Sequence, residues 1–218
     1  MPLFALNESI WFPPVEASLE DGLLAVGGDL STERLLLAYK NGIFPWYDGD
    51  IPLWWCPNPR FVLFPEELKV SKSMKSVLKK NKFEFTVNTA FKEVINQCKI
   101  TKRKDQDGTW IKEEVATAYL ELYKRGIAQS AETWYDGKLV GGLYGVRLGK
   151  VFFGESMFST ESNASKFAFI NYVEQLKEEG VVLIDCQIHT QHLESLGARF
   201  IMREQFIQLL QHYVSEGE

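Results

Sequence analysis

The chain has 218 residues and a formal net charge of −5 at pH 7, with 45% hydrophobic and 24% charged residues. This composition is ordinary for a globular protein with a substantial core, and no apolar run approaches the roughly 18 residues of a membrane-spanning helix. The three cysteines, Cys56, Cys98 and Cys186, are widely separated, which argues against a disulfide framework or a zinc site. Because the first residues also lack a basic and then apolar leader pattern, we expect a cytoplasmic protein with no membrane partner.

Residues 1–65 have the pattern of a small unit of their own. Gly27-Gly28 could suggest a phosphate-binding loop, but no Gly-Lys-Ser/Thr follows, so we interpret these residues as turn glycines. Ser31 is a predicted helix cap, and Gly42 is the natural end of the helix that follows. We therefore expect a small N-terminal α+β domain over residues 1–65 and a larger domain over residues 66–218.

Three of the six tryptophans lie close together in this first unit, at Trp46, Trp54 and Trp55. The prolines around them disfavour regular structure, and aromatic side chains held on irregular loops are good stacking platforms for nucleic-acid bases. The alternative is a hydrophobic seam between two domains. We expect Trp54 and Trp55 to divide these two roles between them.

A lysine-rich stretch follows, with six lysines and no acidic residue between Lys69 and Lys82. Lys72, Lys75 and Lys79 are spaced at i, i+3 and i+7, so they share one face of a helix. Such a patch is typical of a surface that binds a phosphate backbone, although a solvated helix face remains the alternative.

From Phe83 onward the pattern is that of a continuous α/β domain. Asp136-Gly137 is a strong hairpin signal, and the apolar run 181–184 is typical of a strand buried on both faces. The predicted strands cover 83–87, 128–135, 139–148, 151–155 and 181–184, and the predicted helices cover 90–99, 113–124 and 164–179, before a last helix, strand and helix that end at Tyr213. Antiparallel strands, a long helix and a further buried strand follow one another as in a sheet of the N-acetyltransferase type.

Two carboxylates, Glu155 and Asp185, follow strands on either side of the long predicted helix. Strand ends that open onto a helix are where α/β folds place ligands, and a buried charge there needs a partner. The alternative for Glu155 alone is that it accepts hydrogen bonds from loop amides. With both carboxylates considered together, we expect a shared cleft. At the start of the long helix, Ser162 or Asn163 can provide the cap.

A series of short blocks gives the chain a wider resemblance. In order these are Gly42-Ile43-Phe44-Pro45-Trp46, Trp54-Trp55 with Pro57-x-Pro59-Arg60, Gly108-Thr109-Trp110-Ile111, Gly141-Gly142-Leu143-Tyr144-Gly145, Phe153-Gly154-Glu155-Ser156-Met157-Phe158-Ser159, Asn163-Ala164-Ser165-Lys166, Asp185-Cys186-Gln187 and Ser195-Leu196-Gly197-Ala198. Together they resemble the leucyl/phenylalanyl-tRNA–protein transferase family over nearly the whole chain. One departure is Gln129, where many relatives are expected to carry histidine.

The resemblance implies an α/β (α+β) fold with a small N-terminal domain packed on an acetyltransferase-like (GNAT-type) mixed-sheet domain. It also implies an aminoacyltransferase that moves Leu or Phe, and less well Met, from aminoacyl-tRNA to proteins beginning with Lys or Arg. The acceptor is then marked for degradation by the N-end rule pathway. The resemblance implies no metal, nucleotide cofactor or coenzyme A, so no cofactor is expected, and we expect a monomer.

The resemblance also assigns the site. Asp185 and Gln187 would form a relay at the reacting amine, with Asp185 as a base or as the group that orients the amine, and Glu155 would stabilise the same polar site. Trp46 and Trp110 would hold the 3′-terminal adenosine. The pocket for the aminoacyl side chain would consist of Leu143, Phe152, Met157, Phe169, Tyr172 and Ile184, and an apolar pocket of this kind suits several apolar side chains.

Two other classes of function are kept as alternatives. An acyl-CoA-dependent N-acetyltransferase would carry a glycine-rich pyrophosphate loop before its long helix, where this chain has the glycine-free stretch 159–163. A non-catalytic RNA-binding module would account for the lysines and tryptophans but would leave Glu155 and Asp185 unexplained.

Overall fold

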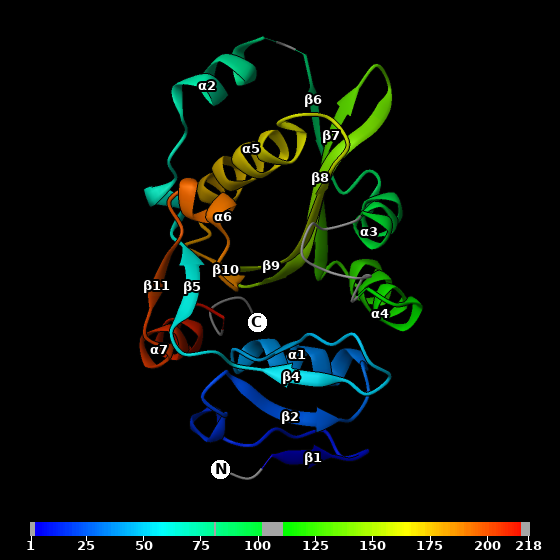
Figure 1. Cartoon of the computed structure of the whole chain (residues 1–218), viewed down its shortest axis with the longest axis vertical. Helices are drawn as coiled ribbons and strands as arrows, with labels where there is room; N and C mark the ends of the chain where they lie inside the picture. Colours follow the sequence, from blue (N-terminus) through cyan, green and yellow to red (C-terminus); the bar gives the residue numbers. More distant parts are fainter. Residues whose placement is uncertain (1–2, 81, 102–110, 215–218) are drawn as a thin grey trace.

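The computed structural model describes residues 3–80, 82–101 and 111–214, and within these ranges the chain forms two β-sheets with helices around them (Figure 1). The smaller sheet has the strand order β1-β2-β4-β3, in which only β1 and β2 are parallel. Helix α1 (Thr32–Lys40) lies on the side of this sheet that faces the rest of the molecule. The strands are β1 (Phe4–Leu6), β2 (Leu23–Gly27), β3 (Phe44–Pro45) and β4 (Leu53–Trp55).

The larger sheet has seven strands in the order β11-β5-β10-β9-β8-β7-β6, and β9 and β10 are its one parallel pair. Its strands are β5 (Arg60–Leu63), β6 (Glu84–Val87), β7 (Ala128–Tyr135), β8 (Lys138–Leu148), β9 (Val151–Ser159), β10 (Leu183–Gln187) and β11 (Arg199–Ile201). The helices are α2 (Lys72–Lys79), α3 (Phe91–Ile100), α4 (Glu113–Lys124), α5 (Ala164–Glu178), α6 (Gln191–Ser195) and α7 (Arg203–Tyr213), with 3₁₀ turns at Val15–Ala17 and Pro65–Glu67.

Two groups of buried side chains fill the two faces of the larger sheet. One group includes residues of α3, α4 and the small sheet. Within it, Tyr39 of α1 packs on Phe153 of β9 with ring centroids 5.0 Å apart. The other group lies under α5, whose side chains are buried on more than one face, as at Phe167, Phe169 and Tyr172. The first group therefore makes the small sheet and the large sheet parts of one continuous core.

Several predicted elements are confirmed residue for residue. The helix over 113–124 and the strand over 128–135 have the predicted bounds. Asp136 and Gly137 both have positive φ angles, 50° and 71°, as a two-residue hairpin turn requires. Ser31 caps α1 by accepting a hydrogen bond from the Arg34 amide. The predicted fold class, α/β (α+β) with a small N-terminal part and a larger mixed sheet, is confirmed.

The two strands that carry the carboxylates differ from their prediction. β9 continues past Glu155 to Ser159, because its second half still pairs with β8, while β10 pairs with β9 only as far as Phe153. β10 begins at Leu183, because Val181 is still hydrogen-bonded to the end of α5 through Leu176. The site therefore lies where two parallel strands separate, and Glu155 is inside a strand and not at its end.

The prediction that the side chain of Ser162 or Asn163 caps α5 is wrong. Asn163 is the N-cap residue, but it has a left-handed backbone (φ 69°) and its side chain makes no capping hydrogen bond. Ser159 instead accepts a hydrogen bond from the Ser165 amide at 3.2 Å.

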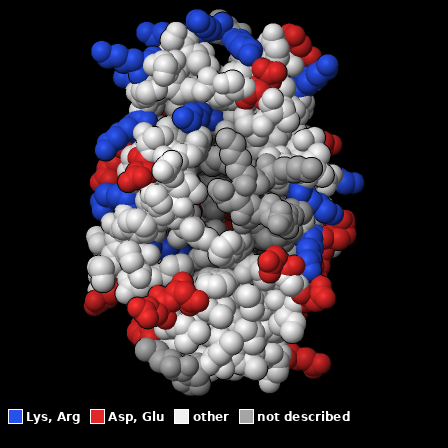
Figure 2. Space-filling view, in the orientation of Figure 1, with Lys and Arg blue, Asp and Glu red and all other residues white. Residues whose placement is uncertain are grey.

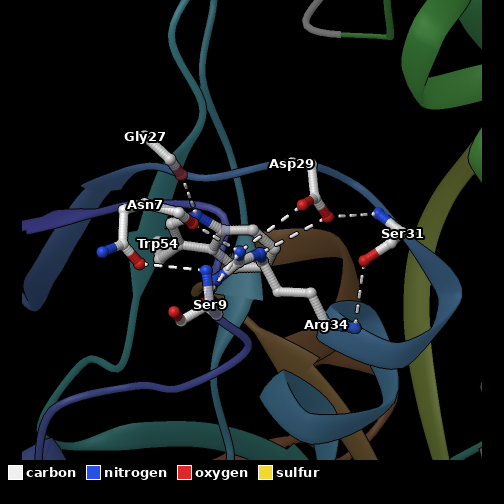
Figure 3. A network of polar contacts seen from close by, with 7 residues as sticks. All are labelled: Asn7, Ser9, Gly27, Asp29, Ser31, Arg34 and Trp54. Atoms are coloured by element: carbon white, nitrogen blue, oxygen red, sulfur yellow. Dashed lines mark hydrogen bonds and ion pairs between the residues drawn. The ribbon is translucent and has the colours of Figure 1, made fainter.

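The turn glycine Gly28 lies against a buried arginine, Arg34, whose polar contacts are drawn in Figure 3. Gly27 and Gly28 have φ angles of 83° and 74°, and a Cβ on Gly28 would lie 3.0 Å from the Arg34 guanidinium carbon. The Arg34 guanidinium donates to the backbone oxygens of Asn7 and Ser9 at 2.7 and 3.2 Å, and Asp29 completes the group. Gly28 thus makes room for an arginine that ties the N-terminal segment to α1.

The change from the small sheet to the large one falls between Trp55 and Arg60. β5 precedes the predicted boundary at residue 65, yet it lies between β10 and β11 in the larger sheet. The division into residues 1–65 and 66–218 stays a prediction.

Candidate active site

A cavity of about 700 Å³ opens where β9 and β10 separate. Side chains of both strands line it, with Leu143 from β8, Phe169 from α5 and Trp46, which directly follows β3. The cavity therefore combines an apolar wall with the polar side chains Glu155, Asp185 and Gln187.

Five of the six residues predicted for the aminoacyl pocket line this cavity, namely Leu143, Phe152, Met157, Phe169 and Ile184. Tyr172 lies behind the wall, with its ring against Phe152 at a centroid distance of 5.2 Å. Its hydroxyl donates to the Gln129 side-chain oxygen at 2.6 Å, so the residue that departs from the expected histidine supports a pocket residue from behind.

Glu155 accepts hydrogen bonds from three side chains that come from three different elements. Tyr39 of α1 donates to Oε1 at 2.8 Å, Tyr119 of α4 donates to Oε2 at 2.7 Å, and Nε2 of Gln187 donates to Oε1 at 2.7 Å. Glu155 is half-buried and lines the cavity, whereas both tyrosines are fully buried. The alternative in which Glu155 only accepts from loop amides is therefore wrong.

Burial raises the pKa of Glu155 to about 7, although the hydrogen bonds from Tyr119, Tyr39 and Gln187 act in the opposite direction. The negative charge of Asp185 adds to the rise. Burial also raises the pKa values of Tyr39 and Tyr119 well above their usual range, so both phenols keep their protons at neutral pH. A carboxyl group that titrates near pH 7 can both take up and release a proton under physiological conditions.

Asp185 is fully buried and is held by an arginine that sequence reasoning did not assign to the site. Nε and Nη2 of Arg60 donate to its two oxygens at 2.8 and 2.7 Å, which is a bidentate ion pair. The Arg60 guanidinium lies between the rings of Phe44 and Phe206, at 4.7 Å from each centroid. Asp185 is therefore an anchored charge with both oxygens engaged.

Gln187 owes its position to a break in the β10 ladder. Its φ angle is 61°, in the left-handed region that non-glycine residues rarely adopt, and the pairing with β5 shifts between Asp185 and Gln187. Its amide N–H donates to Asp185 Oδ1 at 3.0 Å, which stabilises this conformation. The bulge brings the Gln187 side chain to Glu155.

Trp54 and Trp55 differ in burial, while their predicted division of roles stays a prediction. Trp54 is fully buried and its indole N–H donates to the Gly27 oxygen at 2.8 Å. Trp55 is half-buried, and its ring packs on Trp46 with centroids 5.7 Å apart. Trp46 lines the cavity, as its predicted adenosine contact requires, while Trp110 lies outside the described residues.

The predicted lysine helix exists as α2. Lys72, Lys75 and Lys79 are exposed, while Met74 is buried against α5 and its neighbours. Figure 2 shows Lys and Arg side chains gathered at the end of the molecule that carries α2. None of these three lysines lines the cavity.

Sequence reasoning missed three residues of the site. Tyr39 and Tyr119 fall on apolar helix faces, and a single sequence holds no sign that their hydroxyls meet at one carboxylate. Arg60 did leave a signal, because an arginine at the start of a buried strand needs a buried anion.

The described part of the chain contains neither a helix that is long and apolar enough to cross a membrane nor a group of three or more His, Cys, Asp or Glu residues that could hold a metal ion.

Comparisons with known proteins give a consistent family. Residues 62–211 match the family model described as leucyl/phenylalanyl-tRNA protein transferase, and residues 28–58 match the model of its N-terminal domain. A leucyl/phenylalanyl-tRNA–protein transferase of Syntrophobacter fumaroxidans is 54% identical over 217 residues, which cover 99% of this chain and 93% of that protein. A protein of the same name from Flavobacterium johnsoniae is 56% identical over 209 residues, covering 95% of this chain and 99% of that protein.

One comparison with a solved structure illustrates a distant likeness. A GCN5-related N-acetyltransferase from Kribbella flavida aligns with a TM-score of 0.40 at 11% identity, covering 76% of this chain and 59% of that one. A likeness at this level carries no functional inference. The family is shown instead by the two matching family models and by relatives that are more than 50% identical. The chain belongs to the leucyl/phenylalanyl-tRNA protein transferase family.

Proposed function

We propose that this enzyme transfers leucine or phenylalanine, and methionine less well, from aminoacyl-tRNA to the N-terminal amine of proteins that begin with Lys or Arg. The acceptor is thereby marked for N-end rule degradation, and the enzyme acts in the cytoplasm as a monomer. The observation that carries this proposal is a single cavity in which five apolar side chains adjoin Glu155, Asp185 and Gln187.

The apolar wall suits the aminoacyl side chain. Phe152, Met157 and Ile184 offer bulk and no hydrogen-bonding group that would require a polar partner. Selection by bulk alone is worth about 1–3 kcal/mol per methylene, so a pocket of this kind accepts related apolar side chains with graded preference. Met157 adds an adaptable surface.

The reaction asks little of the enzyme beyond positioning and proton transfer. The ester bond between amino acid and tRNA is already activated, so the amine has to be held near the carbonyl carbon and has to lose a proton. An N-terminal amine has an ordinary pKa of about 8, and the pKa of Glu155 is about 7. These values are close enough for Glu155 to accept the proton without a large energetic cost.

Gln187 and Asp185 then have supporting roles. Gln187 donates its side-chain N–H to Glu155, which leaves the amide oxygen as an acceptor for the incoming amine. Asp185 is occupied by Arg60 and by the Gln187 amide, so of its two expected roles we favour orientation over proton abstraction.

The donor tRNA would bind along a second surface. Lys72, Lys75 and Lys79 would contact the phosphate backbone, and Trp46 with Trp110 would hold the 3′-terminal adenosine. The Trp46 ring already packs against Trp55, which restricts its motion.

Transfer of radiolabelled leucine from Leu-tRNA to a model protein tests the proposal. Matched acceptors should begin with Lys, Arg or Ala, and the label should appear on the first two only. Label on all three, or on none, would contradict the acceptor assignment. A titration with coenzyme A is the control for the acetyltransferase alternative, and it should show no binding.

A further inference from the structure

The hydroxyls of Tyr39 and Tyr119 and the carboxyl group of Glu155 form a triangle of short oxygen–oxygen contacts. Tyr39 and Tyr119 are 2.5 Å apart at their hydroxyls, Tyr39 is 2.8 Å from Oε1, and Tyr119 is 2.7 Å from Oε2. Each contact needs one proton between its two oxygens to be a hydrogen bond, and each tyrosine supplies one. With Glu155 ionised, two protons serve three contacts, and one pair of oxygens is left in close contact without a proton.

We propose that Tyr39, Tyr119 and Glu155 form a closed hydrogen-bond ring that is complete only when Glu155 carries a proton, and that the two tyrosines are positioning residues for this proton. In the complete ring protonated Glu155 donates to Tyr119, which reverses the hydrogen bond that Tyr119 donates to the ionised carboxylate. Tyr119 then donates to Tyr39, and Tyr39 donates back to Glu155. Gln187 fixes this direction, because its Nε2 donates to Oε1 and keeps that oxygen an acceptor. The proton therefore rests on Oε2, facing Tyr119.

The groups around the ring favour the protonated form. Burial and the charge of Asp185 raise the pKa of Glu155 to about 7, against the hydrogen bonds that Tyr119, Tyr39 and Gln187 donate to its ionised form. Arg60 interacts electrostatically with this carboxyl group, and its Nε and Nη2 are engaged by Asp185. Tyr144 of β8 also faces the pair of tyrosines and brings no positive charge.

The ring gives the amine proton a destination, and this part of the inference rests on the proposed function. An ammonium group that meets ionised Glu155 gives up one proton and completes the ring, which leaves a neutral amine. The amine nitrogen then forms the C–N bond, and its next proton goes to the 3′ oxygen as the C–O bond breaks. Glu155 returns its own proton to solvent before the next turnover, so protons and electron pairs balance.

Infrared titration of the substrate-free protein tests the ring independently of transfer activity. The band of the protonated carboxyl group is assigned by its absence in Glu155→Gln, and its midpoint is compared in wild type, Tyr39→Phe and Tyr119→Phe. Removing either hydroxyl takes two hydrogen bonds of the ring from the form with protonated Glu155. The form with ionised Glu155 loses only one hydrogen bond, and it also loses the close pair of oxygens that has no proton between them. The midpoint should therefore fall by roughly half to one pH unit, which is up to a tenfold change in the ionisation constant.

The opposite sign would overturn the inference. Two tyrosines that merely stabilise the anion predict that the midpoint rises when either hydroxyl is removed, and an unchanged midpoint would also exclude the ring. Tyr47→Phe is the matched control, because Tyr47 is a buried tyrosine that donates to a different carboxylate, Glu114, at 2.8 Å. Its midpoint should equal that of wild type.

A measurement on the wild-type protein covers the case in which a phenylalanine variant does not fold. The short hydrogen bond between Tyr39 and Tyr119 should give a strongly downfield proton resonance below the carboxyl midpoint, and this resonance should disappear above that midpoint. A resonance that persists unchanged through the titration would refute the ring. Failure of the transfer assay would leave both of these readouts unaffected.

Discussion

Asp185→Asn should be costly to the fold as well as to activity. The substitution keeps the shape of the side chain and removes its charge, which leaves the Arg60 guanidinium without a counter-ion. Both residues are almost completely buried, at 1% and 0% exposure, and Phe44 and Phe206 close off the two faces of the guanidinium. Arginine stays protonated in proteins, so Arg60 cannot relieve the imbalance by giving up a proton.

The expected size follows from the burial. Breaking a buried ion pair by removing one partner typically costs about 3–5 kcal/mol, against a total stability of about 5–15 kcal/mol for a protein domain. Asp185→Asn should therefore lower the free energy of unfolding by about 3 kcal/mol or more. The Gln187 amide would also be without its charged acceptor, which weakens the strained conformation beside the site.

Removing the other partner should behave differently with pH. In Arg60→Met the unpaired Asp185 can become neutral by taking up a proton, so the destabilisation should shrink as pH falls. Asp185→Asn has no such escape, so its destabilisation should not shrink as pH falls. The double variant should be more stable than Asp185→Asn, since a methionine leaves no buried charge behind.

Urea unfolding followed by circular dichroism at pH 5.5 and 8 would measure all three variants, with the slope m as a check that the unfolded states are comparable. The reasoning fails if Asp185→Asn lies within about 1 kcal/mol of wild type, which is the size of an exposed pair. It also fails if the two single variants show the same dependence on pH.

Two further predictions concern the substrate surfaces. Replacing the exposed lysines of α2 with alanine should weaken tRNA binding and lower the slope of log affinity against log salt concentration by about 0.7–0.9 for each phosphate that is no longer neutralised. Turnover of a minimal aminoacyl-adenosine donor should stay the same. Equal reductions in turnover with both donors would mean that these lysines have a structural role. In the cavity, Met157→Ala should slow transfer of leucine, left beside a void, more than transfer of phenylalanine, and Leu143→Phe should do the reverse. Parallel changes with both donors would remove these two side chains from the pocket.

Local pattern was sufficient for most of the secondary structure. The hairpin at Asp136-Gly137 and the helix over 113–124 depend on turn chemistry and on apolar periodicity, which a short window of sequence contains. The ends of β9 and β10 were harder, because they depend on which neighbouring strand continues to pair. That choice is made by the sheet as a whole and not by either segment.

The polar residues of the candidate site could be predicted, but the side chains that hydrogen-bond to them could not. Glu155 and Asp185 were found because each follows an apolar strand, and Gln187 was added by the family resemblance; the structure brings all three to one cavity. Tyr39 and Arg60 reach them from far earlier in the chain, through the packing of α1 and β5. No pattern local to either residue records such a meeting.

The place of β5 in the larger sheet also affects the order in which the molecule is made. Arg60 and Asp185 are 125 positions apart, and β5 pairs on one side with β10 and on the other with β11. During synthesis at roughly 5–20 residues per second, the ribosome therefore releases β5 many seconds before either partner strand exists. Until then both edges of β5 are unpaired and Arg60 lacks its counter-ion Asp185. Unpaired strand edges make a nascent chain prone to aggregation. β10, which carries Asp185 and Gln187, can pair with β5 only after it has been synthesised. The active site is therefore among the last parts of this protein to form.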